Sequence, residues 1–265
     1  MADSQPGRQQ LPLHPGQTFL CSVLFFLPAL IPSLFGWLNG FLAVPVVYLL
    51  SSRGAQAGTV QLLISLMAAC LAALFIGRIE GFFFSLTLVP LGYSLYRSAQ
   101  AGDSPAVSGA KGGLVLLGVW LLFWSLQGQA SGVDPYTHLR ESLDAGFRQM
   151  LEFATSEEAG LSPEMVYSIQ QTIGEIRETA PRLLPGLLAT LVPVTVWLSM
   201  VTVNGLTGRY RQAGPLWQRY ATWTLPEQLV WAPIAAAGLL LISNGTVHDF
   251  SMWVLLITGT LFFFQ

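Results

Sequence analysis

Apolar runs separated by short polar breaks fill most of the chain, and one long polar stretch interrupts them. A helix needs about 20 apolar residues to cross the roughly 30 Å hydrocarbon core of a bilayer, and several runs approach that length. The predicted spans, in chain order, lie at 18–38, 41–50, 59–76, 82–96, 113–126, 183–203, 229–242 and from 250 onward. The pattern therefore predicts an all-α fold, a polytopic transmembrane helical bundle of about eight spans.

The polar stretch over 128–181 is predicted to form an extramembrane amphipathic helical hairpin. Asp134 followed by Pro135 is typical of an N-cap and a first helical position, and Ser162 followed by Pro163 repeats this start signal. Apolar residues recur at i+3/i+4 spacing in both helices, so each helix has one apolar stripe. The stripe residues that we expect to dock a partner are Leu139, Leu143, Phe147 and Ile169.

The hairpin separates two membrane blocks. Residues 18–127 are expected to hold about five spans, and residues 182–265 to hold three, the last of them cut short because the chain ends within an apolar run. Within the hairpin, the turn is expected at 156–160 and the second helix is expected to end at Pro181. Residues 1–17 are polar and broken by prolines, which predicts a disordered tail.

The side of the membrane on which the hairpin lies depends on the run at 41–50. With eight spans and a cytoplasmic N-terminus, the short cytoplasmic segments carry most of the arginines outside the hairpin. The positive-inside rule then favours a bacterial plasma (inner) membrane protein with its N-terminus in the cytoplasm and its hairpin on the outer side. The run at 41–50 contains Pro45 and could equally be a re-entrant segment, in which case the hairpin moves inside.

Composition agrees with a lipid environment and excludes some functions. Hydrophobic residues make up 52% of the chain and charged residues only 10%, whereas about a quarter of the residues of soluble domains are charged. The net charge of −2 provides no basic field for nucleic acid. Two cysteines and three histidines are scattered without the spacing of metal ligands, and no acid–base pair occurs within the spans. We therefore predict no metal, no cofactor and no enzymatic activity.

Two pairs of residues are candidate ligand-binding groups. Arg78 and Glu80 form a charged turn between two apolar runs, where charge is costly unless it is hydrated or paired. Trp120 and Trp124 lie one helical turn apart and could stack on a planar ligand. An interfacial turn explains the first pair more simply, and an aromatic belt at the membrane surface explains the second.

Two motifs carry a resemblance to a known family. The segment 42–48, followed by Gly54, and the segment 223–226 resemble the bacterial YybS-like family of predicted membrane proteins, a domain of unknown function, as does the final Phe-Gln. That family is distantly similar to the S components of energy-coupling-factor transporters. The resemblance implies capture of a small molecule and docking onto a transmembrane coupling subunit driven by ATPases. Ala68 and Ala72, in the run at 59–76, would then lie on the docking face.

Two functional hypotheses follow. The first is a substrate-capture subunit of a small-molecule transport system, S-component-like, which binds its ligand on the outer side between the bundle and the hairpin. The second is a structural or assembly protein whose hairpin docks another envelope protein. A polar cavity near Arg78, Glu80 and Trp120 would favour the first, and an exposed apolar patch on the hairpin would favour the second.

Overall fold

The computed structural model describes residues 15–156, 160–210, 216–242 and 244–264, and the regular elements among them are all helical. Contacts divide the chain into two compact units. The first unit combines Met1–Leu116 with Thr195–Thr224, and the second combines Leu117–Val194 with Leu225–Gln265. The long helices α7 (Pro105–Ser131) and α9 (Pro163–Tyr210) each contribute residues to both units.

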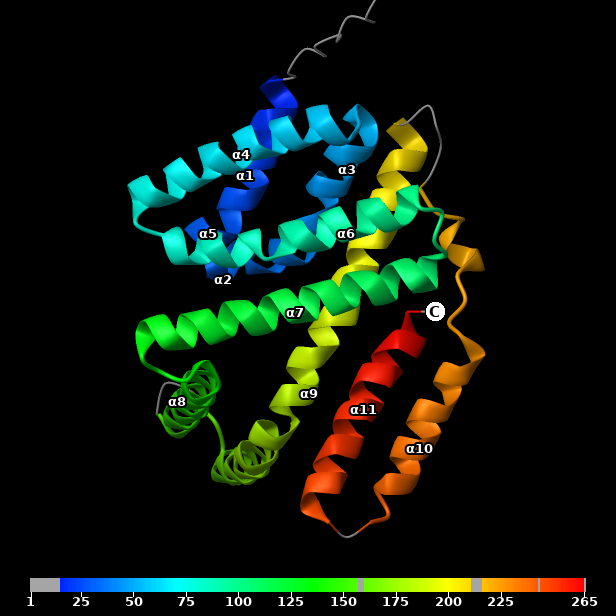
Figure 1. Ribbon diagram of the computed structural model, residues 1–265. Helices are drawn as coiled ribbons and strands as arrows, with labels where there is room; N and C mark the ends of the chain where they lie inside the picture. Colours follow the sequence, from blue (N-terminus) through cyan, green and yellow to red (C-terminus); the bar gives the residue numbers. More distant parts are fainter. Residues whose placement is uncertain (1–14, 157–159, 211–215, 243, 265) are drawn as a thin grey trace, which may run out of the picture. The chain divides into compact units, whose positions relative to one another are not determined.

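The first unit is built around the short helix α3 (Ala43–Arg53), most of whose residues are buried. It packs against α4 (Ala55–Ile76) and α6 (Leu88–Gln100), as Figure 1 shows. Around them lie α1 (Pro15–Leu30), α2 (Pro32–Phe35), the 3-10 helix η1 (Gly36–Phe41), α5 (Ile79–Leu86), and η3 (Tyr220–Thr222) near the end of the unit.

Glycines allow the helices around α3 to approach closely. A Cβ atom at Gly92 of α6 would lie 2.6 Å from Cβ of Val46, and one at Gly58 of α4 would lie 2.7 Å from the carbonyl oxygen of Leu49. Any side chain at either position would collide with α3. Small residues at helix contacts are typical of membrane bundles, where close packing has to replace the hydrophobic effect.

The first apolar run is bent and starts earlier than predicted. Helix α1 begins at Pro15, three residues before the predicted start at 18, and the rest of the predicted tail lies outside the described residues. The axis turns by 116° between Pro15–Leu30 and Pro32–Phe41. Pro32 begins α2 and has no N–H to continue the hydrogen bonds of α1, which explains a break at this point.

The second unit holds the helical hairpin and a pair of C-terminal helices. Helix α8 (Pro135–Thr155) begins as the Asp-Pro pair predicts, because the backbone N–H of Thr137 donates to Oδ2 of Asp134 at 2.9 Å. Its partner is the first part of α9, which begins at Pro163, also as predicted. The turn between them lies partly outside the described residues. After η4 (Glu227–Val230), α10 (Trp231–Leu239) packs against α11 (Gly245–Phe263) (Figure 1).

The prediction that the second hairpin helix ends at Pro181 is wrong. Helix α9 runs through 48 residues without interruption, and Pro181, Pro185 and Pro193 all lie inside it. Each proline removes one backbone hydrogen bond, but its fixed φ is close to the helical value. Membrane helices tolerate this loss where neighbouring groups satisfy the freed carbonyls.

Four of the described helices are long and apolar enough to cross a membrane, or five if the bent pair α1 with 32–41 is one span. The four are Ala55–Ile76, Pro105–Ser131, Pro163–Arg209 and Gly245–Phe263. The runs at 41–50 and 229–242 form α3 and α10, of 11 and 9 residues, and 11 residues rise only about 16 Å. The chain is therefore a multi-pass membrane protein, but its described helices do not show the predicted number of about eight spans.

Candidate functional site

A groove between the two helices of the hairpin is the candidate site. It has a volume of about 480 Å³ and lies within the second unit. We call it the hairpin groove, and its lining residues are Thr137, Arg140, Glu141, Leu143, Asp144, Phe147, Arg148, Arg177, Ala180 and Pro181. All three arginines of the predicted hairpin stretch line this groove, although the stretch as a whole is strongly acidic.

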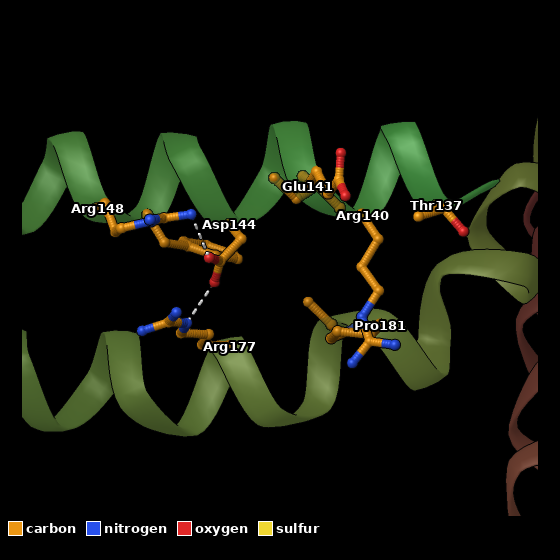
Figure 2. A pocket seen from close by; sticks show the side chains of 10 residues that line it. Thr137, Arg140, Glu141, Asp144, Arg148, Arg177 and Pro181 are labelled. Carbon is orange, nitrogen blue, oxygen red and sulfur yellow. Dashed lines mark hydrogen bonds and ion pairs between the residues drawn. The ribbon is translucent and has the colours of Figure 1, made fainter. Parts of the chain in front are cut away.

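Asp144 joins the two helices across the groove. Its Oδ1 accepts a hydrogen bond from Nε of Arg177 on α9 at 2.5 Å, and its Oδ2 lies 2.9 Å from a terminal nitrogen of Arg148, one turn further along α8 (Figure 2). These contacts hold the pKa of the Asp144 carboxyl below its usual value, first because Arg177 donates to it and then through the charges of both arginines. The carboxylate is therefore charged at neutral pH.

Arg140 is the arginine of the groove that is left without a carboxylate partner among the described residues. Its side chain extends from α8 toward Pro181 on α9 (Figure 2). Three arginines and two carboxylates give the groove a net charge of +1. Guanidinium groups bind carboxylate and phosphate through paired N–H donors. The arrangement is thus suited to an anion and not to a cation.

Tyr136 forms a hydrogen bond to Pro181, the lining residue of the groove that is nearest the predicted span 183–203. Its hydroxyl donates to the carbonyl oxygen of Pro181 at 2.9 Å. In an α-helix this carbonyl would accept from residue 185, but residue 185 is proline and has no N–H. Tyr136 therefore satisfies the carbonyl that Pro185 leaves free, and it fixes α8 against α9 at the same point.

The predicted pair Arg78 and Glu80 lies in the first unit. Arg78 is the N-cap residue of α5 and Glu80 lies in the first turn of that helix. Both side chains are exposed, and neither makes an ion pair with a described residue. The predicted aromatic pair Trp120 and Trp124 lies on the part of α7 that belongs to the second unit, half-buried and exposed respectively. The ligand-binding role of all four stays a prediction.

The predicted docking residues of the hairpin turn partly inward. Leu143 and Phe147 line the hairpin groove, and Leu139 and Ile169 are likewise half-buried. Other apolar residues of the hairpin are exposed instead, among them Met150, Phe153, Met165 and Tyr167.

The predicted docking alanines on α4 also differ from their neighbours. Ala68 is exposed and Ala72 is half-buried, whereas Ala69 and Ala73 are the alanines that pack into the first unit. A docking role for Ala68 and Ala72 stays a prediction.

Comparison with known proteins identifies a family. One family, described as "Predicted membrane protein (DUF2232)", matches residues 19–265. The chain belongs to this family. Neither curated proteins nor solved structures gave a match. Membership agrees with the multi-pass fold, and no named relative links the chain to the YybS-like proteins or to S components.

A polar network in the first unit was not predicted from the sequence. Nε1 of buried Trp217 donates to Oγ of Ser108 at 3.0 Å, and the Ser108 hydroxyl in turn donates to Oγ of Ser98, also at 3.0 Å. The Ser98 hydroxyl donates to Asp103, whose Oδ2 lies 2.6 Å from Nζ of Lys111. These groups satisfy one another, so we interpret the network as structural.

Gln61 was also missed by sequence reasoning. This residue of α4 is fully buried, and neither its Oε1 nor its Nε2 has a partner among the described residues. A glutamine within an apolar run is the one signal that could have drawn attention to it. Among the described residues, no three His, Cys, Asp or Glu side chains are grouped so that they could hold a metal.

Proposed function

We propose that this protein is a substrate-capture subunit of a small-molecule transport system and that the hairpin groove captures the anionic group of its ligand. The observation that carries the proposal is the gathering of Arg140, Arg148 and Arg177 around one groove with a net charge of +1. Anion capture needs guanidinium donors at a fixed separation, and the Asp144 bridge holds two of them in place.

The proposal extends to partners and topology. The resemblance to S components supports docking onto a transmembrane coupling subunit with ATPases, and the protein has no enzymatic activity of its own. The proposal includes about eight spans, an N-terminus in the cytoplasm, and a hairpin on the outer side of a bacterial plasma membrane. In support of a further span, Thr87 between α5 and α6 has helical dihedral angles, so helical backbone continues from Ile79 to Gln100.

Native mass spectrometry of the gently purified protein tests ligand capture. We expect a small anionic ligand to copurify with the wild type and to be lost from an Ala180→Trp variant, because Ala180 lines the groove and tryptophan would fill it. Thr179→Trp is the matched control, since exposed Thr179 is not among the lining residues. Equal ligand in all three proteins, or no ligand in the wild type, contradicts the proposal.

Labelling of introduced cysteines tests the topology. In a variant without Cys21 and Cys70, a cysteine at exposed Gln149 is expected to react with a membrane-impermeant maleimide in intact cells. A cysteine at exposed Ala101, in the loop between α6 and α7, is expected to react only after the membrane is opened. The reverse pattern would place the hairpin in the cytoplasm.

The second candidate is a structural or assembly protein whose hairpin docks another envelope protein. The exposed residues Phe153 and Tyr167, at 63% and 70% of their full accessible area, favour it. Deleting Asp134 to Ala180 would then abolish recovery of the partner while the bundle stays folded. A Phe153→Ser and Tyr167→Ser double variant should have the same effect if docking depends on this surface, and should leave ligand capture unchanged.

A further inference from the structure

The end of the hairpin groove nearest the predicted span 183–203 adjoins the start of that span. Pro181 lines the groove, and the predicted span begins two residues later, a rise of about 3 Å. Tyr136 donates to the carbonyl of Pro181. Tyrosine gathers at the level of the lipid headgroups, with its polar atom toward water.

Unused hydrogen-bond donors are present at this end of the groove. A guanidinium carries five N–H donors, and Arg140 makes no ion pair with a described residue. Its side chain reaches toward Pro181, so its charge lies at the end of the groove nearest the span (Figure 2). Asp144 occupies Nε of Arg177 and one terminal nitrogen of Arg148, which leaves further donors on both.

The groove also has an apolar side. Leu143, Phe147 and Ala180 line it together with the arginines. A ligand with a charged head and an apolar body would contact both kinds of surface, whereas a small hydrated anion would contact only the arginines.

From these positions we infer that the hairpin groove binds the phosphate group of an anionic phospholipid, with Arg140 as the principal phosphate ligand. The inference rests on the proposed anion capture and names its substrate class. Free phosphate shares the same chemistry, but lipid phosphate is held at the membrane surface, where the predicted span begins beside Arg140 and Tyr136. The apolar lining residues then face the glycerol and the first acyl carbons.

Binding of lipid and of free phosphate by the whole protein in nanodiscs tests this inference. In the lipid arm, nanodiscs of phosphatidylcholine contain increasing phosphatidylglycerol, and lipid retained after gentle extraction is measured by native mass spectrometry. In the soluble arm, inorganic phosphate is titrated into pure phosphatidylcholine nanodiscs and the heat is measured. We expect selective retention of phosphatidylglycerol and no saturable binding of inorganic phosphate at comparable concentration.

Arginine variants identify the site. Arg140→Gln should weaken phosphatidylglycerol retention about tenfold, since a charge-assisted hydrogen bond contributes on that order. Retention by Arg140→Lys should fall between that of the wild type and that of Arg140→Gln, because lysine keeps the charge but loses the paired donors. Arg97→Gln, at an exposed position of the first unit, makes the same change in net charge and should bind as the wild type does.

Each other outcome has a distinct meaning. Equal losses for the glutamine variants at 140 and 97 overturn the site, because the effect is then one of net charge. Saturable inorganic phosphate binding that Arg140→Gln abolishes overturns the lipid assignment and leaves anion capture standing. Failure of the wild type to bind either probe overturns the lipid inference, and copurification of another ligand lost in Ala180→Trp would still support the proposed function. Circular dichroism and size exclusion verify that every variant is folded.

Discussion

The hydroxyl of Tyr136 donates to the carbonyl oxygen of Pro181, which is the carbonyl that Pro185 cannot satisfy. One side chain thereby compensates for a proline within α9 and fastens α8 to it. The same hydrogen bond thus serves both the backbone of α9 and the contact between the two hairpin helices.

A double-mutant cycle tests this relationship. Tyr136→Phe should lower the free energy of unfolding by about 0.5–1.5 kcal/mol, because the carbonyl loses its donor. In a Pro185→Ala background the same change should cost much less, since the alanine N–H can bond to the Pro181 carbonyl. Thermal unfolding in detergent measures both. Tyr167→Phe is the control, at an exposed position of the same hairpin. Additive effects of the two substitutions would contradict the compensation.

Gly186 allows α11 to pack against α9. A Cβ atom at Gly186 would lie 2.7 Å from Cδ1 of Trp253 and 3.0 Å from its Cα. We expect Gly186→Ala to lower the free energy of unfolding by about 1–3 kcal/mol through overpacking. Gly174, also in α9, has open space around it, so Gly174→Ala should instead stabilise the helix by about 0.5–1 kcal/mol. The same sign for both variants in thermal unfolding would argue against close contact at Gly186.

Substitution of Gln61 is expected to stabilise the protein, in contrast to substitution of Gly186. Its amide is fully buried without a partner among the described residues, and an unsatisfied buried amide destabilises a fold. Gln61→Met should therefore raise the free energy of unfolding, by about 1–3 kcal/mol. Gln56→Met, on the exposed side of the same helix, should have little effect. A destabilised Gln61→Met variant would mean that water or a ligand completes the hydrogen bonds of the amide.

The bridge between α8 and α9 should open in acid. The folded-state pKa of Asp144 is lower than its ordinary value of 3.8, chiefly because Arg177 donates to it. The bridge therefore stabilises the hairpin at pH values above 3.8, and this contribution is lost as the pH falls through the folded-state pKa. Spin labels at exposed Gln149 and Thr172 should show a distance distribution that broadens as the pH falls through the folded-state pKa of Asp144.

Asp144→Asn supplies the control for this measurement. The variant should show the broad distribution at neutral pH and no further change in acid. It should also bind anions more weakly, although the groove then carries one negative charge fewer, because Arg148 and Arg177 are no longer held at a fixed separation. Tighter anion binding would show that the charge of Asp144 matters more than the order it imposes.

Apolar runs and start signals predicted much of the fold, because each depends on neighbouring residues. Asp134 and Pro135 begin α8 and Pro163 begins α9 as expected, since capping is decided within one turn. The end at Pro181 was predicted wrongly, because α9 continues through Pro181 and a distant tyrosine satisfies the carbonyl that Pro185, one turn later, leaves free. The bend at Ile31 and the short α3 likewise depend on packing, which the length of an apolar run does not encode.

The hairpin groove was harder to predict than the hairpin. Charge counting drew attention to nine acidic residues in the stretch, whereas the groove depends on three arginines that lie 8 and 29 residues apart along the chain. The 8-residue spacing of Arg140 and Arg148 places them on one face of α8, but the position of Arg177 depends on how α8 and α9 align. Only the paired helices bring Arg177 to Asp144.

Helix α3 has a consequence for how the protein is made. Its 11 residues are too few to cross the hydrocarbon core, and seven of them are buried within the first unit. Such a segment has little reason to leave the translocation channel for lipid by itself, because its ends would carry unpaired backbone groups into the bilayer. We expect α3 to be released together with α4 and α6, whose Gly58 and Gly92 pack closely against it. Bulky residues at these two glycines should therefore cause failed membrane insertion and degradation during synthesis, before any folded protein exists to be destabilised.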